Sequence, residues 1–397
     1  MYPNLYYVFS DLFGIEISFL KLVNSFGFFV AMAFVTAGFF LKKEFTRLTN
    51  EGVLLATKNK IILGEKVSII SIISQSAIGF IFGWKFLYLL LNANNLFQGS
   101  ILPQTFLFSM DGSVSLGLLG AIGMGGWHWW ESKKNELPRP QSKEVDVHPS
   151  EHIGSILTIA AVGGIIGAKL FHLIEYPDQF IAFIKAPSLN SFLGGLTIYG
   201  GLIVGGISVW LYTRSLGFNF LNVADAAAPS LMIGYGVGRI GCQISGDGDW
   251  GIVNNNPQPE WLSWLPEWTW SYNFPNNVNQ IGRLIKDSDP WTIFPGYGTC
   301  LTEPVYPTSL YETTMAIIIF GILWFVRKKF TTPGILFSIY LIFNGFERFW
   351  IEKIRVNTTF ELIGIKMTQA ELISALLVII GTILLIYLLK LRDKVET

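Results

Sequence analysis

A charged side chain inside an apolar stretch is a candidate for chemistry, because burying its charge in lipid is costly. Arg239 is such a residue, and it lies in Gly234-Tyr-Gly-Val-Gly-Arg239-Ile-Gly. Glycines on both sides would let a bulky ligand approach the helix backbone. A hydrophilic turn containing Asp247 and Asp249 follows. Arg239 therefore either binds an anionic ligand or pairs with one of these aspartates to hold the helix end.

A second cluster of charged residues lies in Asn344-Gly-Phe-Glu-Arg348-Phe-Trp-Ile-Glu352-Lys-Ile-Arg355. The spacing of four and seven residues places Arg348, Glu352 and Arg355 on one helical face. We expect this face and Arg239 to lie at the same depth in the membrane. Two arginines facing a bundle interior would bind a phosphate, since a guanidinium makes forked contacts with it. The alternative is an Arg348–Glu352 ion pair that only satisfies itself.

A third cluster is Tyr306-Pro-Thr-Ser-Leu-Tyr311-Glu312, which opens an apolar stretch. Thr308 or Ser309 could cap the helix that begins here, and Glu312 would then suit the positive end of its dipole. Stabilisation of the helix start alone would explain these residues, without any role in binding or catalysis. The cluster nevertheless returns to the depth of the two arginine clusters, which makes Tyr306, Tyr311 and Glu312 candidate ligand-binding residues.

The elements that must position these side chains are membrane helices. The chain has 397 residues, of which 51% are hydrophobic and only 14% charged, whereas soluble domains carry about 25% charged residues. A helix needs roughly 20 apolar residues to cross a bilayer, and the runs do not alternate in hydrophobicity as barrel strands do. We therefore predict an all-α polytopic bundle of about nine transmembrane helices. The stretches are 17–41, 67–91, 113–130, 153–174, 193–212, 223–245, 309–326, 333–351 and 370–390.

The positive charges predict the orientation of the bundle. If the amino terminus is outside, 17 of the 28 Lys and Arg fall in cytoplasmic segments, 6 in outside segments and 5 within spans. Cytoplasmic loops of membrane proteins carry the excess of positive charge. We therefore expect a multi-pass protein with the amino terminus outside and the carboxyl terminus inside. The first span is expected to be retained as an anchor, because no cleavable signal pattern precedes it.

Three regions follow from this topology. Residues 1–130 form amino-terminal membrane helices, 131–152 a charged cytoplasmic linker, and 153–397 a membrane core with one long outside loop, 246–308. A possible duplicated hairpin links the first and third regions, since Gly79-x-x-x-Gly83-x-Lys85 matches Gly163-x-x-x-Gly167-x-Lys169. The alternative is that small residues spaced by four recur simply because they let membrane helices pack closely.

From about residue 150 onward the chain resembles the prolipoprotein diacylglyceryl transferases. Arg239 to Gly251 is similar to that family's Gly-Arg-x-Gly-Asn-Phe-x-Asn-Gly-Glu-x-Trp-Gly. Tyr306 to Glu312 is similar to its His-Pro-Ser-Gln-Leu-Tyr-Glu, and Arg348 to Arg355 to its Arg-x-x-x-Glu-x-x-Arg. Three matches in order are more specific than any one of them.

The resemblance implies that the thiol of a lipobox cysteine attacks phosphatidylglycerol, takes its diacylglyceryl group as a thioether, and releases glycerol phosphate. The implied partners are phosphatidylglycerol, prolipoprotein signal peptides with a lipobox Cys, and the bilayer, with no nucleic acid. No cofactor is expected, and the four histidines have no metal-ligand spacing. Candidate catalytic residues are Arg239, Arg348, Tyr199 and His172. Candidate substrate-binding residues are Glu352, Arg355, Asp247, Asp249, Tyr306, Tyr311, Glu312, Gly200 and Gly201.

The sequence departs from the family pattern where a base is expected. The family's His-Gly-Gly-Leu is Tyr199-Gly200-Gly201-Leu here, and Tyr306 and Cys242 also replace family residues. A tyrosine is a poor base unless its pKa of about 10 falls. His172, in the outer half of a span, could substitute, and the arginines alone could favour the thiolate. Two other functions remain open: an anionic-lipid transporter or flippase, and a catalytically inactive lipid-binding member of the family.

Overall fold

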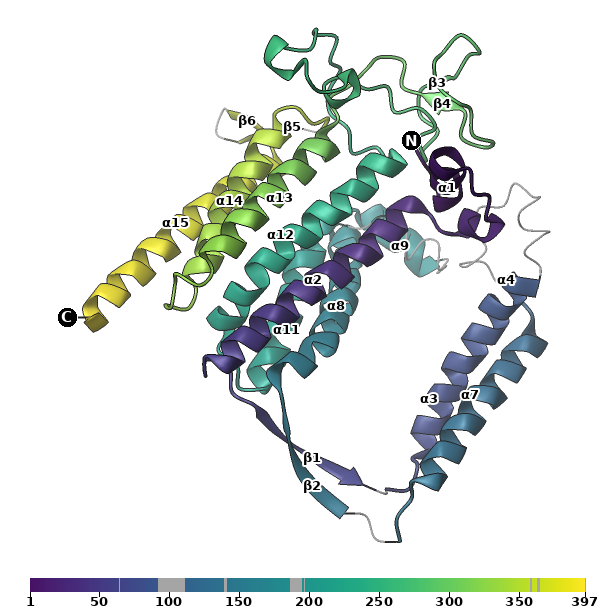
Figure 1. Ribbon diagram of the computed structural model, residues 1–397, viewed down its shortest axis with the longest axis vertical. Helices are drawn as coiled ribbons and strands as arrows, with labels where there is room; N and C mark the ends of the chain where they lie inside the picture. Colours follow the sequence, from purple (N-terminus) through teal and green to yellow (C-terminus); the bar gives the residue numbers. More distant parts are fainter. Residues whose placement is uncertain are drawn as a thin grey trace. The chain divides into compact units, whose positions relative to one another are not determined.

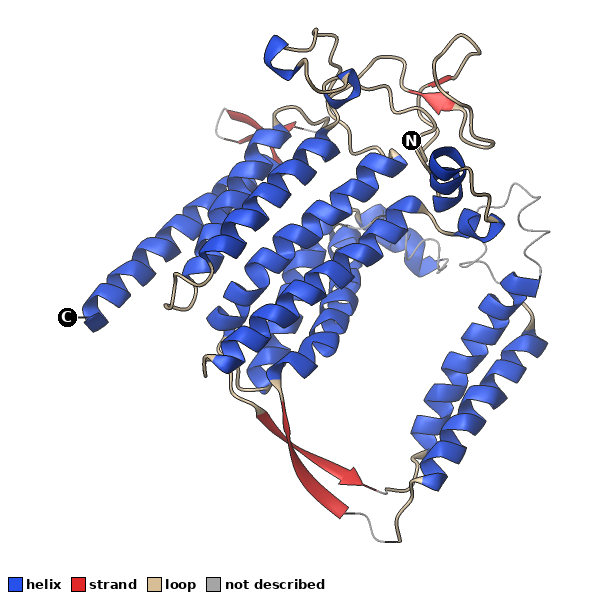
Figure 2. Ribbon diagram, in the orientation of Figure 1, coloured by secondary structure: helices blue, strands red, loops and turns tan. Residues whose placement is uncertain are grey.

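The computed structural model describes residues 1–63, 65–91, 111–138, 141–185, 195, 197–357, 359–362 and 365–396. Within these residues the chain is mainly helical, with short two-stranded ribbons (Figures 1 and 2). It divides into two compact units. Unit 1 comprises 1–55, 149–158 and 209–397, and unit 2 comprises 56–148 and 159–208.

Unit 1 is a helical bundle in which α12 (Phe220–Ser245) packs between α2 (Ser25–Asn50) and α13 (Thr308–Val326) (Figure 1). The remaining long helices, α14 (Ile335–Glu352) and α15 (Gln369–Glu396), form an antiparallel pair, and α14 also contacts α12 and α13. The chain enters this unit through the short helix α1 (Leu5–Phe13).

Glycines allow these helices to approach closely. A Cβ on Gly241 of α12 would lie 2.8 Å from Phe29 Cβ of α2, and one on Gly236 would lie 3.1 Å from Ala316 Cβ of α13. The glycines around Arg239 therefore serve mainly helix packing, and the expectation that they admit a ligand holds at most for Gly238, where a Cβ would meet nothing within 4 Å.

Unit 2 contains two helical hairpins. In the first, α3 (Ile69–Ile81) continues through a π-helical turn (Phe82–Leu87) into α4 (Tyr88–Leu91), and packs on α7 (Val114–Lys134). The second pairs the unit 2 parts of α8 (Ile153–Glu175) and α11 (Ile198–Ser215), and α9 (Pro177–Lys185) follows α8. Gly83 and Gly167 each lie against a backbone carbonyl of the partner helix.

The ribbons were not predicted. The linker 131–152 is not only a charged connection, because α7 continues to Lys134 and residues Gln141–Val147 form β2, antiparallel to β1 (Thr57–Leu63). Lys58 lies opposite Asp146 in this register, and opposite charges on neighbouring strands stabilise such a pair. Two shorter ribbons are β3 (Arg283–Leu284) with β4 (Thr299–Cys300), and β5 (Thr359–Leu362) with β6 (Ile365–Thr368).

Each predicted stretch coincides with a helix, although residues 193, 194 and 196 lie outside the described part of the chain. The first helix differs most, because α2 begins at Ser25 and runs on to Asn50. Five segments are long and apolar enough to cross a membrane: Ser25–Asn50, Ile69–Leu91, Pro149–Glu175, Thr308–Val326 and Gln369–Arg392. The chain is thus a helical membrane protein. The other four spans, and the orientation, stay predictions.

A half-buried carboxylate fixes the start of α14. Asp225 of α12 accepts hydrogen bonds from the backbone amides of Gly334 and Phe337, both at 2.7 Å. The first amides of a helix have no intrahelical acceptor, so the side chain of one helix completes the hydrogen bonding of another.

We predict that Asp225→Ala lowers the free energy of unfolding by about 1–3 kcal/mol, because it leaves two amides without an acceptor. Thermal unfolding in detergent measures the loss. Asp225→Asn keeps one acceptor oxygen and should lose less. Equal stability of Asp225→Ala and the unmodified protein would contradict this account.

Candidate functional site

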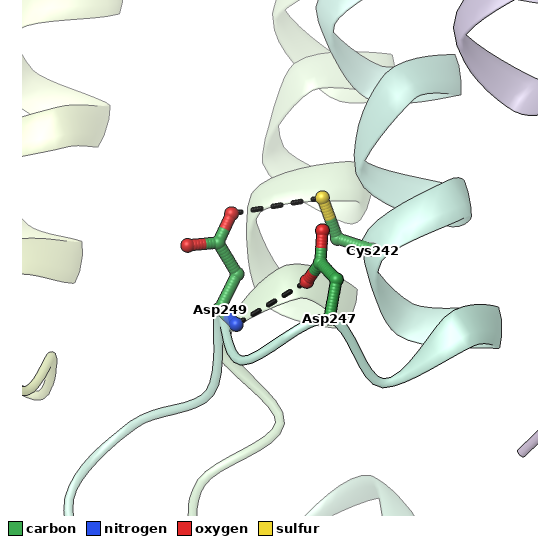
Figure 3. Close-up of side chains that lie close together, drawn as sticks. All are labelled: Cys242, Asp247 and Asp249. Atoms are coloured by element: carbon green, nitrogen blue, oxygen red, sulfur yellow. Dashed lines mark hydrogen bonds between the residues drawn. The ribbon is translucent and has the colours of Figure 1, made fainter. Parts of the chain in front are cut away.

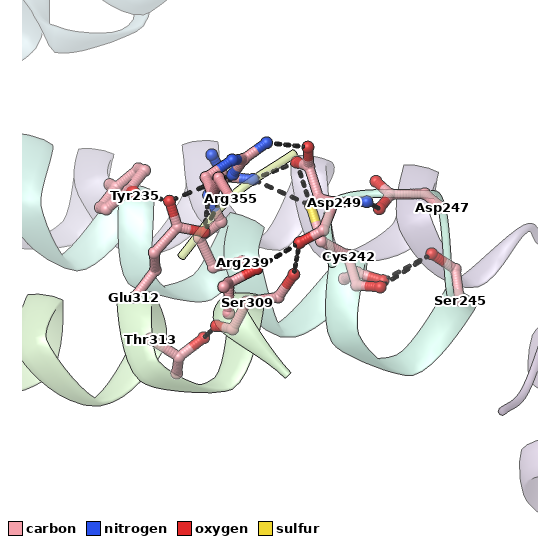
Figure 4. A network of polar contacts seen from close by, with 12 residues as sticks. Tyr235, Arg239, Cys242, Ser245, Asp247, Asp249, Ser309, Glu312, Thr313 and Arg355 are labelled. Carbon is pink, nitrogen blue, oxygen red and sulfur yellow. Dashed lines mark hydrogen bonds and ion pairs between the residues drawn. The ribbon is translucent and has the colours of Figure 1, made fainter. Parts of the chain in front are cut away.

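One buried carboxylate gathers three arginines at one end of unit 1. Glu312 of α13 is fully buried. Its oxygens lie 3.2 Å from Arg239 Nε, 3.1 Å from Arg348 Nη1 and 3.3 Å from Arg355 Nη1. Arg239 comes from α12, and Arg348 from α14. The three sequence clusters therefore meet, as their expected common depth required (Figure 4).

Two further carboxylates complete the arginine cluster. Asp249, in the turn after α12, forms ion pairs with Arg239 and Arg355. Glu352 pairs with Arg348 at 3.0 Å, one turn along α14. Both alternatives raised from the sequence, an Arg239–aspartate pair and an Arg348–Glu352 pair, are therefore present. Neither pair is isolated, however, because Glu312 joins them into one network of three positive and three negative groups.

The charges of this network shift the pKa values of two carboxyl groups in the turn after α12. Burial alone would raise the pKa of Asp249, but Arg239 and Arg355 outweigh burial and hold that pKa below its usual range. For Asp247 burial dominates, and together with the neighbouring charge of Asp249 it raises the pKa. Asp247 instead accepts a hydrogen bond from the Asp249 amide at 3.2 Å, so its role here is to shape the turn.

The third sequence motif holds the loop onto the bundle. Thr308 and Ser309 do not cap α13 with their side chains. Their hydroxyls donate instead to the Asp249 carbonyl at 2.7 and 3.0 Å. Glu312 lies beyond the first turn, so its partners are the arginines rather than the helix dipole. Tyr311 donates to the carbonyl of Thr269 in the loop 246–308 at 3.0 Å.

Tyr306 and the loop backbone extend this attachment. The Tyr306 carbonyl accepts a hydrogen bond from Gly251 N at 2.9 Å, and its ring packs edge-on against Trp270. A Cβ on Gly251 would lie 2.5 Å from the Ile354 carbonyl. Only glycine fits between Tyr306 and the Ile354 carbonyl, which explains why the motif that begins at Arg239 ends with Gly251.

Four other candidate residues lie in unit 2, namely Gly200, Gly201, His172 and Tyr199. Gly200 and Gly201 pack α11 against α8: added Cβ atoms would lie 2.4 Å from the Gly167 carbonyl and 3.1 Å from the Gly164 carbonyl. His172 is buried, and its ring centroid lies 4.8 Å from that of Tyr176. Tyr199 is half-buried in the first turn of α11.

Two residues beside the arginine cluster were not predicted from the sequence. The Tyr235 hydroxyl lies 2.9 Å from Glu312 Oε1 and 3.4 Å from Glu347 Oε1. Tyr235 precedes Arg239 by one helical turn, and Glu347 precedes Arg348 directly. Spacing could have identified Tyr235, whereas Glu347 lies off the face shared by Arg348, Glu352 and Arg355.

Cys242, Asp247 and Asp249 lie close together, with ligand atoms within 4.8 Å of one another (Figure 3). Their donor types would suit a cation. Asp249 is already neutralised by two arginines, however, and Arg239 Nη1 lies 3.6 Å from Cys242 Sγ. A nearby guanidinium disfavours a second cation, so we assign no metal to this group.

Comparison with known proteins identifies the family. The family model for prolipoprotein diacylglyceryl transferase matches residues 113–387, which extends further toward the amino terminus than the motifs indicated. The match includes all three arginines of the cluster.

Similar proteins carry the name phosphatidylglycerol–prolipoprotein diacylglyceryl transferase. One from Bifidobacterium adolescentis is 26% identical over 75% of this chain and 80% of its own length. One from Corynebacterium efficiens is 28% identical over 66% and 74%, and one from Dehalococcoides mccartyi 27% identical over 70% and 88%. With most of its length matched by the family model, the chain belongs to the prolipoprotein diacylglyceryl transferase family.

Proposed function

We propose that the protein transfers the diacylglyceryl group of phosphatidylglycerol to the lipobox cysteine of prolipoproteins, the first step of lipoprotein maturation. The names of its relatives support this substrate pair. The observation that carries the proposal is the cluster of three arginines around the buried carboxylate of Glu312. Positive groups preorganised in a dry site stabilise a departing phosphate far better than water does.

The cluster has to rearrange when a phosphate binds. Three arginines are paired with three carboxylates, so a phosphate can be bound only by N–H donors that the carboxylates leave free or give up. An arginine presents five N–H donors, and Nε of Arg355 has no hydrogen-bond partner among the described residues. We propose that Arg239 and Arg348 turn part of their donors to the phosphate, while Glu312 keeps the guanidinium groups in place.

The transporter alternative is less well supported. Transporter folds are built from repeats that span the whole fold, and any duplication here covers one hairpin per copy. We infer such a duplication because equivalent hydrogen bonds occur at residues 84 positions apart. Ser113 N donates to the Trp84 carbonyl at 3.2 Å, and Thr197 N to the Ala168 carbonyl at 3.0 Å. The remaining alternative is that the protein is a catalytically inactive, lipid-binding member of the family. An assay of lipid transfer to a lipobox peptide distinguishes it from an active enzyme.

We predict that Arg239→Ala lowers transfer of labelled lipid to a lipobox peptide roughly 10²- to 10³-fold, because one donor to the developing charge is lost. Arg239→Lys should recover only part of the rate, since an ammonium lacks the forked geometry. Arg283→Ala is the matched control: this arginine pairs with Asp289 within the outside loop. Wild-type rates in both Arg239 variants would give this residue a purely structural role.

The lost family histidine gives a second prediction. We propose that Tyr199 hydrogen-bonds the lipid phosphate or glycerol, so Tyr199→Phe should slow transfer without changing its pH profile, because nothing that titrates is removed. His172→Gln should be nearly silent. The same assay across pH tests both variants. A normal rate in the Tyr199→Phe, His172→Gln double variant would exclude both residues from the reaction.

We also propose that the protein lies in the inner membrane, with residues 1–16, 246–308 and 355–368 outside. An impermeant maleimide added to whole cells should label a cysteine placed at Ser263 and spare one at Ser142, both of which are exposed positions. The two native cysteines are buried, which keeps the background low. Labelling of the cysteine at Ser142 alone would show the opposite orientation.

A further inference from the structure

Glu347 differs from the other carboxylates near the arginine cluster. Asp249, Glu312 and Glu352 each form ion pairs with arginine. Glu347 is 4% exposed, and among the described residues its Oε1 accepts only from Tyr235 while its Oε2 has no hydrogen-bond partner. A buried carboxyl oxygen without a donor is rare and needs an explanation.

The charged and titratable groups around Glu347 come from each helix packed on α14. From α12 come Tyr235 and Arg239, and from α13 Glu312. Its own helix contributes Arg348 and Tyr340. The helix α15 carries Glu371, which is paired with Lys353. Of these groups, Tyr235 makes the one direct hydrogen bond to Glu347.

The charge balance of the site leaves Glu347 as a fourth carboxyl group. Arg239, Arg348 and Arg355 are matched by Asp249, Glu312 and Glu352. A buried carboxylate with no ion pair takes up a proton more readily than one held by guanidinium groups. Glu347 is therefore the group of this site best suited to receive a proton.

Tyr235 connects this carboxyl group to the cluster. Its hydroxyl lies between Glu347 Oε1 at 3.4 Å and Glu312 Oε1 at 2.9 Å. A hydroxyl can donate one hydrogen bond and accept another. Tyr235 can therefore pass a proton to Glu347 as it takes one up itself, without ever carrying a full charge.

We infer that Glu347, reached through the Tyr235 hydroxyl, accepts the proton of the acceptor thiol. The inference rests on the proposed transfer reaction. The S–H proton moves to the Glu347 carboxylate, the sulfur electron pair forms a bond to the glycerol carbon of the lipid, and the carbon–oxygen bond to the phosphate breaks. Glycerol phosphate leaves with that electron pair, and the carboxylic acid later returns its proton to water.

The test compares a cysteine peptide with the same lipobox peptide carrying selenocysteine, using the purified full chain and phosphatidylglycerol vesicles. A selenol is already ionised at neutral pH and needs no base. With the cysteine peptide, Glu347→Gln should reduce the rate at pH 7 roughly 100-fold. With the selenocysteine peptide it should transfer at close to the wild-type rate. Tyr235→Phe should behave in the same way.

The pH profile provides a second readout. In Glu347→Gln the rate with the cysteine peptide should rise with pH until the thiol itself ionises, at about 8.5, so that the deficit shrinks in alkali. Glu303→Gln, an exposed position in the outside loop, is the matched control and should follow the wild type.

Several outcomes overturn the inference. An equal loss with both peptides would make Glu347 structural, and an unchanged rate and profile in Glu347→Gln would remove it from the reaction. Both outcomes are distinct from failure of the proposed function, in which the unmodified protein transfers lipid to neither peptide.

Discussion

The burial of Glu312 is the constraint on which the end of unit 1 that holds the arginine cluster depends. A carboxylate with no solvent contact requires compensating charge, and Arg239, Arg348 and Arg355 supply it from three parts of the chain. These arginines would repel one another without it. Glu312 thereby fixes the relative positions of α12, α13, α14 and the segment after α14. The helices are joined at this level by charge, whereas deeper in the unit they are joined by apolar contacts such as those around Met232 and Leu323.

This arrangement bears on the proposed reaction, because the guanidinium groups that would contact a phosphate are held inside the bundle by carboxylates. Free guanidinium groups inside an apolar bundle would be costly, and groups bound too tightly would not respond to a ligand. Although the three arginines share Glu312 and pair with Asp249 or Glu352 as well, Arg355 Nε keeps no hydrogen-bond partner among the described residues. Breaking a buried ion pair by removing one partner costs about 3–5 kcal/mol. Substitutions of Glu312 should therefore affect folding and the proposed reaction together. Glu347 carries no ion pair, so its substitution should affect the reaction without this loss of stability.

Local pattern predicted the helices and the three motifs, because apolar length and spacing along one helix are properties of neighbouring residues. The sequence also indicated that the motifs lie at one depth. The hub role of Glu312 could not be predicted, since it depends on which faces of α12, α13 and α14 meet, and its position suggested a helix dipole contact instead. Glu347 was missed for a related reason: its partner Tyr235 is more than 100 residues away in the chain. The β1–β2 ribbon was missed because β2 lies in the charged segment that we predicted to be a linker, far from β1 in the sequence.

The attachment of the turn at Asp249 has a consequence for how this protein tolerates change. Its side chain is held by Arg239 and Arg355, its carbonyl by Thr308 and Ser309, and Gly251 is enclosed by Tyr306 and the Ile354 carbonyl. The loop 246–308 therefore has two mechanically different parts. Beyond this anchor, insertions or an affinity tag at an exposed position such as Gly296 leave the arginine cluster untouched, whereas a one-residue change of length between Ser245 and Gly251 removes the cluster's carboxylate from its place.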